Sequence, residues 1–137
     1  MSNRNGCIVV AGCSRLGAGI AGKLSEDMKD VIVVDNDKKA FRKLPYSYGG
    51  ITVTGSITDI DKMSDSNIVN ASVFIAVTNS DSINICASQI AKEMFGIPKV
   101  ISRIYDEDKV DLLKNMGIET ICPSRLSREE INHYIGE

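Results

Sequence analysis

The stretch Cys7-Ile-Val-Val-Ala-Gly12-Cys-Ser-Arg15-Leu-Gly17 is an apolar run that stops at a glycine and leads into a helix-forming segment. A second apolar run, Val31-Ile-Val-Val-Asp35, ends in an acid 18 residues beyond Gly17. In such a pattern the first glycine allows a tight turn, and the last lets the helix pack closely on the sheet. The two runs together predict a βαβ unit with a nucleotide at the N-terminus of its helix.

The rest of the chain alternates between short apolar runs and segments with helical periodicity. Nearly continuous apolar runs rich in β-branched residues are typical of strands covered on both faces. The predicted strands are residues 7–11, 31–35, 51–54, 72–77, 99–105 and 119–122. The predicted helices are 15–28, 81–95, 106–116 and 124–135, with weaker segments at 37–44 and 59–65. Ser124 is the expected N-cap of the last helix.

Strands that alternate with helices require right-handed crossovers and a parallel sheet. We therefore predict an α/β fold, a Rossmann-type three-layer sandwich with a six-stranded parallel sheet in the order 3-2-1-4-5-6. The 137 residues fit a single domain, 1–137.

Charge and hydropathy exclude several classes of partner. The 16 basic and 18 acidic side chains give a formal charge of -2, so nothing draws the chain toward nucleic acid. Apolar runs of about five residues are far shorter than the ~20 needed to span a bilayer. The first six residues lack the apolar core of a signal peptide. We expect a cytoplasmic protein without membrane insertion.

The sequence offers little for catalysis or metal binding. Cys7, Cys13, Cys86 and Cys122 form no C-x-x-C pair, and the one histidine, His133, is expected to face solvent. The cysteines are expected to be reduced and mostly buried, with a redox role for Cys13 in the glycine turn as the alternative. We predict no catalytic residues and no metal.

The glycine turn carries the predicted phosphate site. Ser14 stands where the middle glycine of the fingerprint usually lies, and its hydroxyl could bond a phosphate oxygen. Backbone N–H groups of the first helical turn and the forked Arg15 add further donors. Asp35 is expected to accept hydrogen bonds from ribose hydroxyls and to repel a 2′-phosphate, which disfavours NADP. Asp37 either caps a helix or contacts the ligand.

Other polar residues follow the predicted third, fourth and fifth strands. Ligands of open α/β sheets bind at the carboxyl ends of the strands. Thr54-Gly-Ser-Ile-Thr-Asp59 and Val77-Thr-Asn-Ser-Asp81 should lie there, with Asn84 one helical turn further on. Arg103 lies in an apolar strand and needs a partner, either a phosphate or a carboxylate of the core.

These motifs resemble the TrkA-type N-terminal domain, also called RCK or KTN, the regulator of potassium conductance. The resemblance covers nearly the whole chain in order and includes Ser102-Arg103-Ile104 and Gly117-Ile-Glu-Thr-Ile-Cys-Pro123. It implies a regulatory subunit of a potassium uptake system or channel that binds NAD(H), AMP, ADP or ATP. It also implies a homodimer or higher ring that acts on a membrane transporter or channel subunit.

The resemblance assigns roles to individual residues. It implies phosphate contacts from Gly12, Cys13, Ser14, Arg15, Leu16 and Gly17. Ribose contact falls to Asp35, with Asn36 beside it, and adenine-side contacts fall to Ser56, Ile57 and Thr58. Thr78, Asn79, Asp81 and Asn84 are placed at the far side of the cleft, and Arg103 completes the predicted set.

The chain departs from the family pattern at three places. Ser14 replaces the second glycine, and Ser56 replaces a frequent aspartate. We expect the family's smaller C-terminal lobe to be absent, because the sequence ends soon after the last helix. The chain is then either a shortened form or a subunit that works without that lobe. On that helix Ile131, Tyr134 and Ile135 either pack on a partner subunit or close the domain's own core. Two other functions remain open: a small NAD-dependent oxidoreductase, and a degenerate Rossmann interaction subunit with no ligand.

Overall fold

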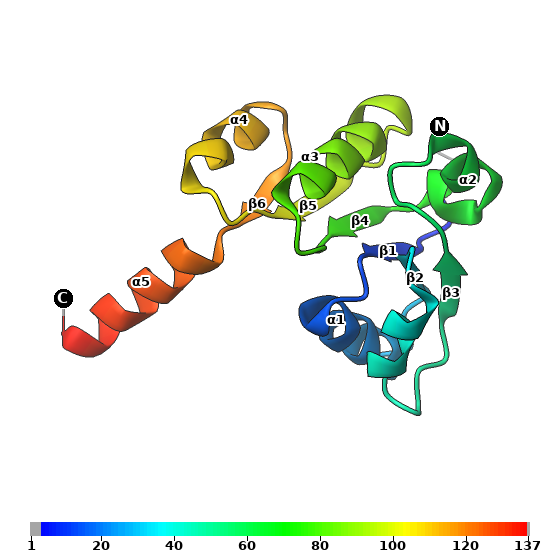
Figure 1. Ribbon diagram of the computed structural model, residues 1–137, viewed down its shortest axis with the longest axis horizontal. Coiled ribbons are helices and arrows are strands. Elements are labelled where there is room, and N and C mark those ends of the chain that lie inside the picture. The colour runs from blue at the N-terminus through cyan, green and yellow to red at the C-terminus, as the bar shows by residue number, and fades with distance from the viewer. Residues whose placement is uncertain (1–3, 137) are drawn as a thin grey trace.

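Six parallel strands pair in the order β3-β2-β1-β4-β5-β6, which confirms the predicted topology. The computed structural model describes residues 4–136. The strands are β1 (Ile8–Ala11), β2 (Val31–Asp35), β3 (Ile51–Thr54), β4 (Val73–Ala76), β5 (Lys99–Arg103) and β6 (Glu119–Ile121). Their central members are buried, because helices lie on both faces of the sheet (Figure 1). The strand order reverses between β1 and β4, so a crevice is expected at that point.

The helices divide between the two faces. The helical segments are α1 (Arg15–Glu26), η1 (Lys38–Lys43), α2 (Ile60–Asp65), η2 (Asn67–Asn70), α3 (Asp81–Gln89), η3 (Ile90–Met94), η4 (Glu107–Lys109), α4 (Val110–Asn115) and α5 (Pro123–Ile135). One core cluster, which includes Phe74 and Leu113, lies under α2, α3 and α4. The second, which includes Val33 and Ala21, lies under α1 and η1.

Several helix predictions differ from the structure in detail. The segment predicted as one helix over 81–95 is α3 followed by a π turn, η3, in which the N–H of Phe95 bonds to the carbonyl of Ile90. The segment 37–44 is a 3₁₀ helix, η1, and Asp37 caps it by accepting from the N–H of Lys39. The Ser124 cap was wrong, because α5 begins one residue earlier with Pro123 and no side chain caps it.

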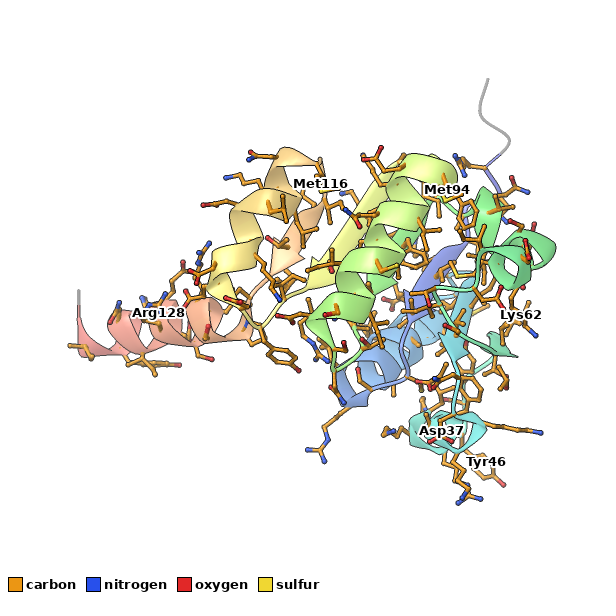
Figure 2. The ribbon with its side chains drawn as sticks, turned by 45° about the horizontal axis from the view of Figure 1, so that its top comes forward. Asp37, Tyr46, Lys62, Met94, Met116 and Arg128 are labelled. Carbon is orange, nitrogen blue, oxygen red and sulfur yellow. The ribbon has the colours of Figure 1, made fainter. Side chains whose placement is uncertain are left out.

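The last helix, α5, stands apart from the rest of the molecule. It has no buried residue, and it projects from one end of the sheet (Figure 1). Figure 2 shows Arg128 on this projecting helix, far from Tyr46 at the opposite end. Its attachment includes ion pairs from Arg125 and Arg128 to Glu107, at 3.6 Å and 2.6 Å. Ile131, Tyr134 and Ile135 are all exposed, so the prediction that they close the domain's own core was wrong.

Because α5 projects, one face of β5 and β6 has little cover. Within residues 4–136, α1 and η1 lie on this side of the sheet but under its other half (Figure 1). Ile101 on β5 is only half-buried, and Ile121 on β6 is 40% exposed. Doubly wound sheets normally carry helices over both faces along their whole width. This side of β5 and β6 is therefore an incomplete layer of the fold.

Candidate functional site

Two glycines make the turn between β1 and α1 possible. Gly12 has a φ of +109°, and a Cβ at this position would lie 2.8 Å from the backbone nitrogen of Thr78. A Cβ on Gly17 would overlap the carbonyl oxygen of Gly12. The turn therefore packs backbone against backbone, both within itself and against the segment that follows β4. Only glycine fits both positions without displacing the chain.

The carboxylate of Asp35 is fixed beside this turn. Its Oδ2 accepts a hydrogen bond from the N–H of Cys13 at 2.8 Å, and its Oδ1 accepts one from the N–H of Asp37 at 2.9 Å. Each bond uses one acceptor site of an ionised carboxylate that has about four. Asp35 thus orients the glycine turn and still has acceptor capacity for hydroxyl donors.

A cleft of about 140 Å³ opens at the carboxyl ends of the strands, next to Asp35. Eight residues line this cleft, and six of them are predicted site residues. The other two, Val34 and Ile83, were not predicted. The predicted residues in the lining are Gly12, Asp35, Asn36, Ser56, Ile57 and Thr78. Val34 is one residue before Asp35, so strand alternation alone gave no reason to single it out.

Ser14 does not point its hydroxyl at open space. Its Oγ donates to the carbonyl oxygen of Val77 at 2.7 Å and accepts from the N–H of Gly17 at 3.1 Å. The second bond makes Ser14 the N-cap of α1. The predicted bond from this hydroxyl to a phosphate would therefore compete with two bonds inside the protein. At the first two positions of α1, the N–H groups of Arg15 and Leu16 have no intrahelical partner.

The segment after β4 is held by a buried amide. Asn84 accepts from the N–H of Thr78 at 2.9 Å and from its hydroxyl at 2.6 Å. Its Nδ2 donates to the carbonyl oxygens of Thr78, at 3.0 Å, and Arg103, at 2.8 Å. The carboxylate of Asp81 accepts from the N–H groups of Tyr105 and Asp106, at 2.8 Å and 2.9 Å. Asn84 and Asp81 therefore position the loop at the cleft rather than line the cleft.

Arg103 is buried at the end of β5, with 7% of its surface exposed. Its Nη2 donates to the carbonyl oxygens of Val77 and Thr78 and to Oδ1 of Asn79, each at 3.1 Å. The expectation of a carboxylate partner was wrong, because backbone carbonyls and one side-chain amide fill that role. Its Nε is buried and has no hydrogen-bond partner among the described residues.

A larger hollow of about 750 Å³ lies along one face of α1. Leu16, Ile20 and Leu24 form its apolar wall, and Arg15, Lys23 and Arg103 are the charged residues of its lining. This hollow borders the incompletely covered side of β5, because Arg103 and Ile101 point to the same face of that strand. Arg15 and Leu16 are therefore placed at the hollow, outside the lining of the cleft.

The other predicted residues lie around the cleft without lining it. Thr58 bonds through its hydroxyl to Ser56 at 2.9 Å. Cys13 lies beneath the turn, where its thiol bonds to the carbonyl of Ala40 at 3.3 Å. Burial, and then the charge of Asp35, raise the pKa of the Cys13 thiol, and Lys43 only partly opposes this. A raised pKa disfavours the reactive thiolate, which weakens the redox alternative.

Lys43 is a further residue that the sequence interpretation missed. Its Nζ donates to the carbonyl oxygen of Cys13 at 3.3 Å, so a cation at the end of η1 contacts the glycine turn. Four basic residues lie in η1, and that charge was the available signal. Exposed His133 lies on α5, as predicted. Cys7, Cys13 and Cys122 are buried, which confirms that the cysteines are mostly buried, and Cys86 is the exception.

The strand order, the glycine turn and the acid at the end of β2 define a Rossmann-type domain with its cleft at the carboxyl ends of the strands. Comparison with known sequences narrows this class. Residues 8–123 match the TrkA-N domain, and the chain belongs to that family.

Curated relatives carry names from potassium uptake. The Trk system potassium uptake protein TrkA of Streptomyces coelicolor is 37% identical over 124 residues, which are 90% of this chain and 56% of that protein. The TrkA homolog of Methanothermobacter thermautotrophicus is 31% identical over 119 residues, 86% of this chain and 55% of that protein. The chain thus spans little more than half the length of these relatives.

Solved structures share the fold at low sequence identity. The TrkA-N domain of the inner membrane protein ybaL from Escherichia coli superposes with a TM-score of 0.79 at 16% identity, covering 98% of this chain and 97% of that one. GsuK bound to ADP gives 0.75 at 20% identity, covering 90% and 33%. The GsuK channel bound to NAD gives 0.73 at 20% identity, covering 88% and 22%.

Among residues 4–136, no helix is both long and apolar enough to cross a membrane. The same part of the chain contains no group of three or more His, Cys, Asp or Glu side chains arranged to hold a metal ion.

Proposed function

We propose that this chain is the nucleotide-binding regulatory domain of a potassium uptake system or channel. One observation carries the proposal: the carboxylate of Asp35 is fixed at the rim of a cleft directly beside the Gly12 turn. A carboxylate in this position accepts hydrogen bonds from ribose hydroxyls in nucleotide-binding Rossmann domains. Membership of the TrkA-N family and the names of the curated relatives supply the potassium context.

The ligand that we propose is an adenine nucleotide or NAD(H). Solved GsuK structures of the same fold bind ADP and NAD. In this chain the ribose would bond to Asp35, and the base would lie toward Ser56 and Ile57, which line the same cleft. The phosphates would meet the N-terminus of α1, where the helix dipole and the free N–H groups favour an anion. Arg15 and Arg103, which line the hollow beside α1, add positive charge nearby.

The cleft favours binding over hydride-transfer chemistry. A dehydrogenase needs a general acid or base within reach of the reacting atoms. The lining of the cleft contains no His, Tyr or Lys, and Asp35 is its one ionisable side chain. Asp35 is also engaged in two backbone bonds. These observations support the regulatory function over the oxidoreductase alternative.

We also propose that the chain works as a homodimer in which each α5 packs on the partner. Ile131, Tyr134 and Ile135 follow an i, i+3, i+4 pattern and form one apolar stripe on α5. The hollow beside α1 offers Leu16, Ile20 and Leu24 next to the part of this sheet face, over β5 and β6, that no helix covers. A second copy of α5 would supply the missing layer. Such an arrangement would place a partner helix next to Arg103, which lines the same hollow.

Titration calorimetry with ADP and with NADH tests ligand binding. We expect at least one to bind, and Asp35→Asn to weaken its binding by about 1.5–3 kcal/mol, since the hydroxyls would lose a charged acceptor. Asparagine keeps one oxygen to accept from the N–H of Cys13. Asp106→Asn is the matched control, because Asp106 accepts a backbone N–H in the same way but lies outside the cleft. Absence of binding by both nucleotides would favour the degenerate, ligand-free alternative.

Rubidium uptake by cells that carry or lack the gene tests the potassium role. Loss of the protein should change the uptake rate at low external potassium, and the wild-type gene should restore it. The Asp35→Asn gene should fail to restore regulation, whereas Asp106→Asn should succeed. The same uptake rate in cells that carry and cells that lack the gene would contradict the proposed role, and so would steady oxidation of NADH by the purified protein with carbonyl substrates.

A further inference from the structure

We propose that Ser14 makes the cleft selective for adenosine mononucleotides over dinucleotides, because it closes the crossing between the ends of β1 and β4. The inference rests on the proposed function, since it concerns the ligand of the same cleft. The dinucleotide-binding fingerprint has three glycines in this turn. This chain keeps the first and the last, Gly12 and Gly17, and has Ser14 in place of the middle one.

Ser14 bridges the glycine turn and the segment after β4. Its Oγ donates to the carbonyl oxygen of Val77 at 2.7 Å, which joins the β1–α1 turn to the residue just beyond β4. The same Oγ accepts from the N–H of Gly17 at 3.1 Å. The hydroxyl hydrogen and one lone pair are therefore both in use, and the side chain is held across the crossing. A glycine at this position could make neither bond.

Other contacts tighten the same junction. The turn at Gly12 lies so close to Thr78 that a Cβ would come within 2.8 Å of its backbone nitrogen. On the opposite side, Nη2 of Arg103 donates to the carbonyl oxygen of Val77 at 3.1 Å. That carbonyl thus has two donors for its two lone pairs. The segment after β4 is pinned between the glycine turn and β5.

The shape of the cleft agrees with a closed crossing. In dinucleotide-binding folds the ligand passes over the point where the strand order reverses, here between β1 and β4. The cleft is lined from the β1, β2 and β3 side, with Thr78 and Ile83 as its far wall. Among the described residues, none from β5 or β6 lines it. Beyond it, Asn84 and Asp81 already bond to backbone groups of the protein.

A mononucleotide does not need this crossing. The phosphate chain of ADP ends near the N-terminus of α1 and is free to turn toward Arg15. In NADH the second phosphate carries another nucleoside, which must continue past Ser14 and Val77. ADP and NADH share the adenosine and the two phosphates, so the change in their affinity ratio on substitution of Ser14 measures the effect of the crossing.

Calorimetry of ADP and NADH with the wild type, Ser14→Ala and Ser14→Gly tests the inference. The wild type should bind ADP at least about tenfold more tightly than NADH, the size expected for one disrupted hydrogen-bonded junction. Both variants lack the bridging hydroxyl, so in both the ratio of ADP affinity to NADH affinity should fall by about tenfold. If Ser14→Ala does not fold, Ser14→Gly alone provides the measurement.

Ser80→Ala is the matched control. Ser80 caps α3 by accepting from the N–H of Ile83 at 3.3 Å, so its loss also removes a helix cap but leaves the bridge to Val77 intact. The ratio should stay at the wild-type value in this variant. Equal affinity of the wild type for ADP and NADH would overturn the inference alone, and so would an unchanged ratio in both Ser14 variants. Failure of the wild type to bind either nucleotide would overturn the proposed function, and the inference with it.

Discussion

Two glycines and a carboxylate determine the geometry of the β1–α1 turn. Gly12 and Gly17 let backbone pack against backbone, and Asp35 accepts a hydrogen bond from the N–H of Cys13. The apolar run before Gly12 and the spacing from Gly17 to Asp35 are local signals, so the turn and the acid were predictable. The hydrogen-bond partners were not. The carbonyls that receive Arg103, and the one that receives Ser14, belong to Val77 and Thr78, which lie more than 20 residues away along the chain. Such partners depend on which strands lie side by side in the sheet, and the sequence around each residue does not show this.

Gly12→Ala should destabilise the protein. The new methyl would meet the backbone of Thr78 in a φ region that alanine rarely adopts, which should cost about 1–3 kcal/mol. Gly19→Ala is the contrasting substitution, because a Cβ there meets no atom within 4 Å inside α1. It should stabilise the helix by about 0.5–1 kcal/mol. Urea unfolding of both variants measures the difference, and equal stabilities would contradict the packing described for the turn.

Tyr48 gives a pH-dependent contribution to stability at the alkaline end. Its hydroxyl donates to the carbonyl of Ile51 at 2.9 Å and contacts that of Val31 at 3.3 Å. Burial raises its pKa to about 12. Because the folded pKa lies above the ordinary value of 10.0, the contribution is complete below pH 10 and is lost as the pH rises toward 12.

Tyr48→Phe should lower the free energy of unfolding at pH 8 by about 0.5–1.5 kcal/mol, the usual value of one hydrogen bond. The difference between wild type and variant should then shrink between pH 10 and pH 12. Chemical unfolding across this range measures it. A difference that stays constant through pH 12 would show that the phenol makes no such bond.

Strands were easier to predict than helices. Residues 31–35 and 51–54 match β2 and β3 at both ends, because both runs are rich in β-branched residues and are bounded by polar residues or glycine. The π turn after α3 and the 3₁₀ start before α4 both fell inside segments predicted as single helices. Apolar spacing over a few residues does not distinguish these variants of helix. The sequence also did not show that α5 would be exposed. An amphipathic helix has the same apolar pattern whether its own domain or another chain covers it.

At the level of elements, Glu107 should determine how firmly α5 is held. Bonds from Arg128, and then the charges of Arg128 and Arg125, lower the pKa of the Glu107 carboxyl. A lowered folded pKa means that the contribution is present above the carboxyl's ordinary pKa and is lost as the pH falls through the folded value. We expect the angle between α5 and the rest of the domain to vary more at acid pH than at neutral pH.

Glu107→Gln should loosen α5 at neutral pH without a large change in global stability, since exposed ion pairs contribute little. Distance distributions between spin labels on α5 and on α3 should broaden in the variant. Glu129→Gln removes a carboxylate from α5 for which no salt bridge to Arg125 or Arg128 is formed, so it should leave the distribution narrow. Equal widths in both variants would mean that other contacts hold the helix.

For the whole molecule, the projecting α5 predicts association. Ile131→Asp should convert a dimer to a monomer, because a charge would enter the apolar stripe that we place on the partner. Asn132→Asp adds the same charge at the neighbouring position, off the stripe, and should leave the dimer intact. Light scattering after size-exclusion chromatography gives the mass. A wild type that is monomeric at working concentration would refute the α5 exchange.

The carbonyl group of Val77 is also a natural spectroscopic reporter. Two donors, from Ser14 and Arg103, converge on its oxygen, and a carbonyl with two donors vibrates at a lower frequency than one with a single donor. Isotopic labelling of this amide with ¹³C would separate its infrared band from the bulk of the protein. The position of that band would then report, in real time, whether an arriving molecule pulls the two halves of the sheet apart or leaves them joined.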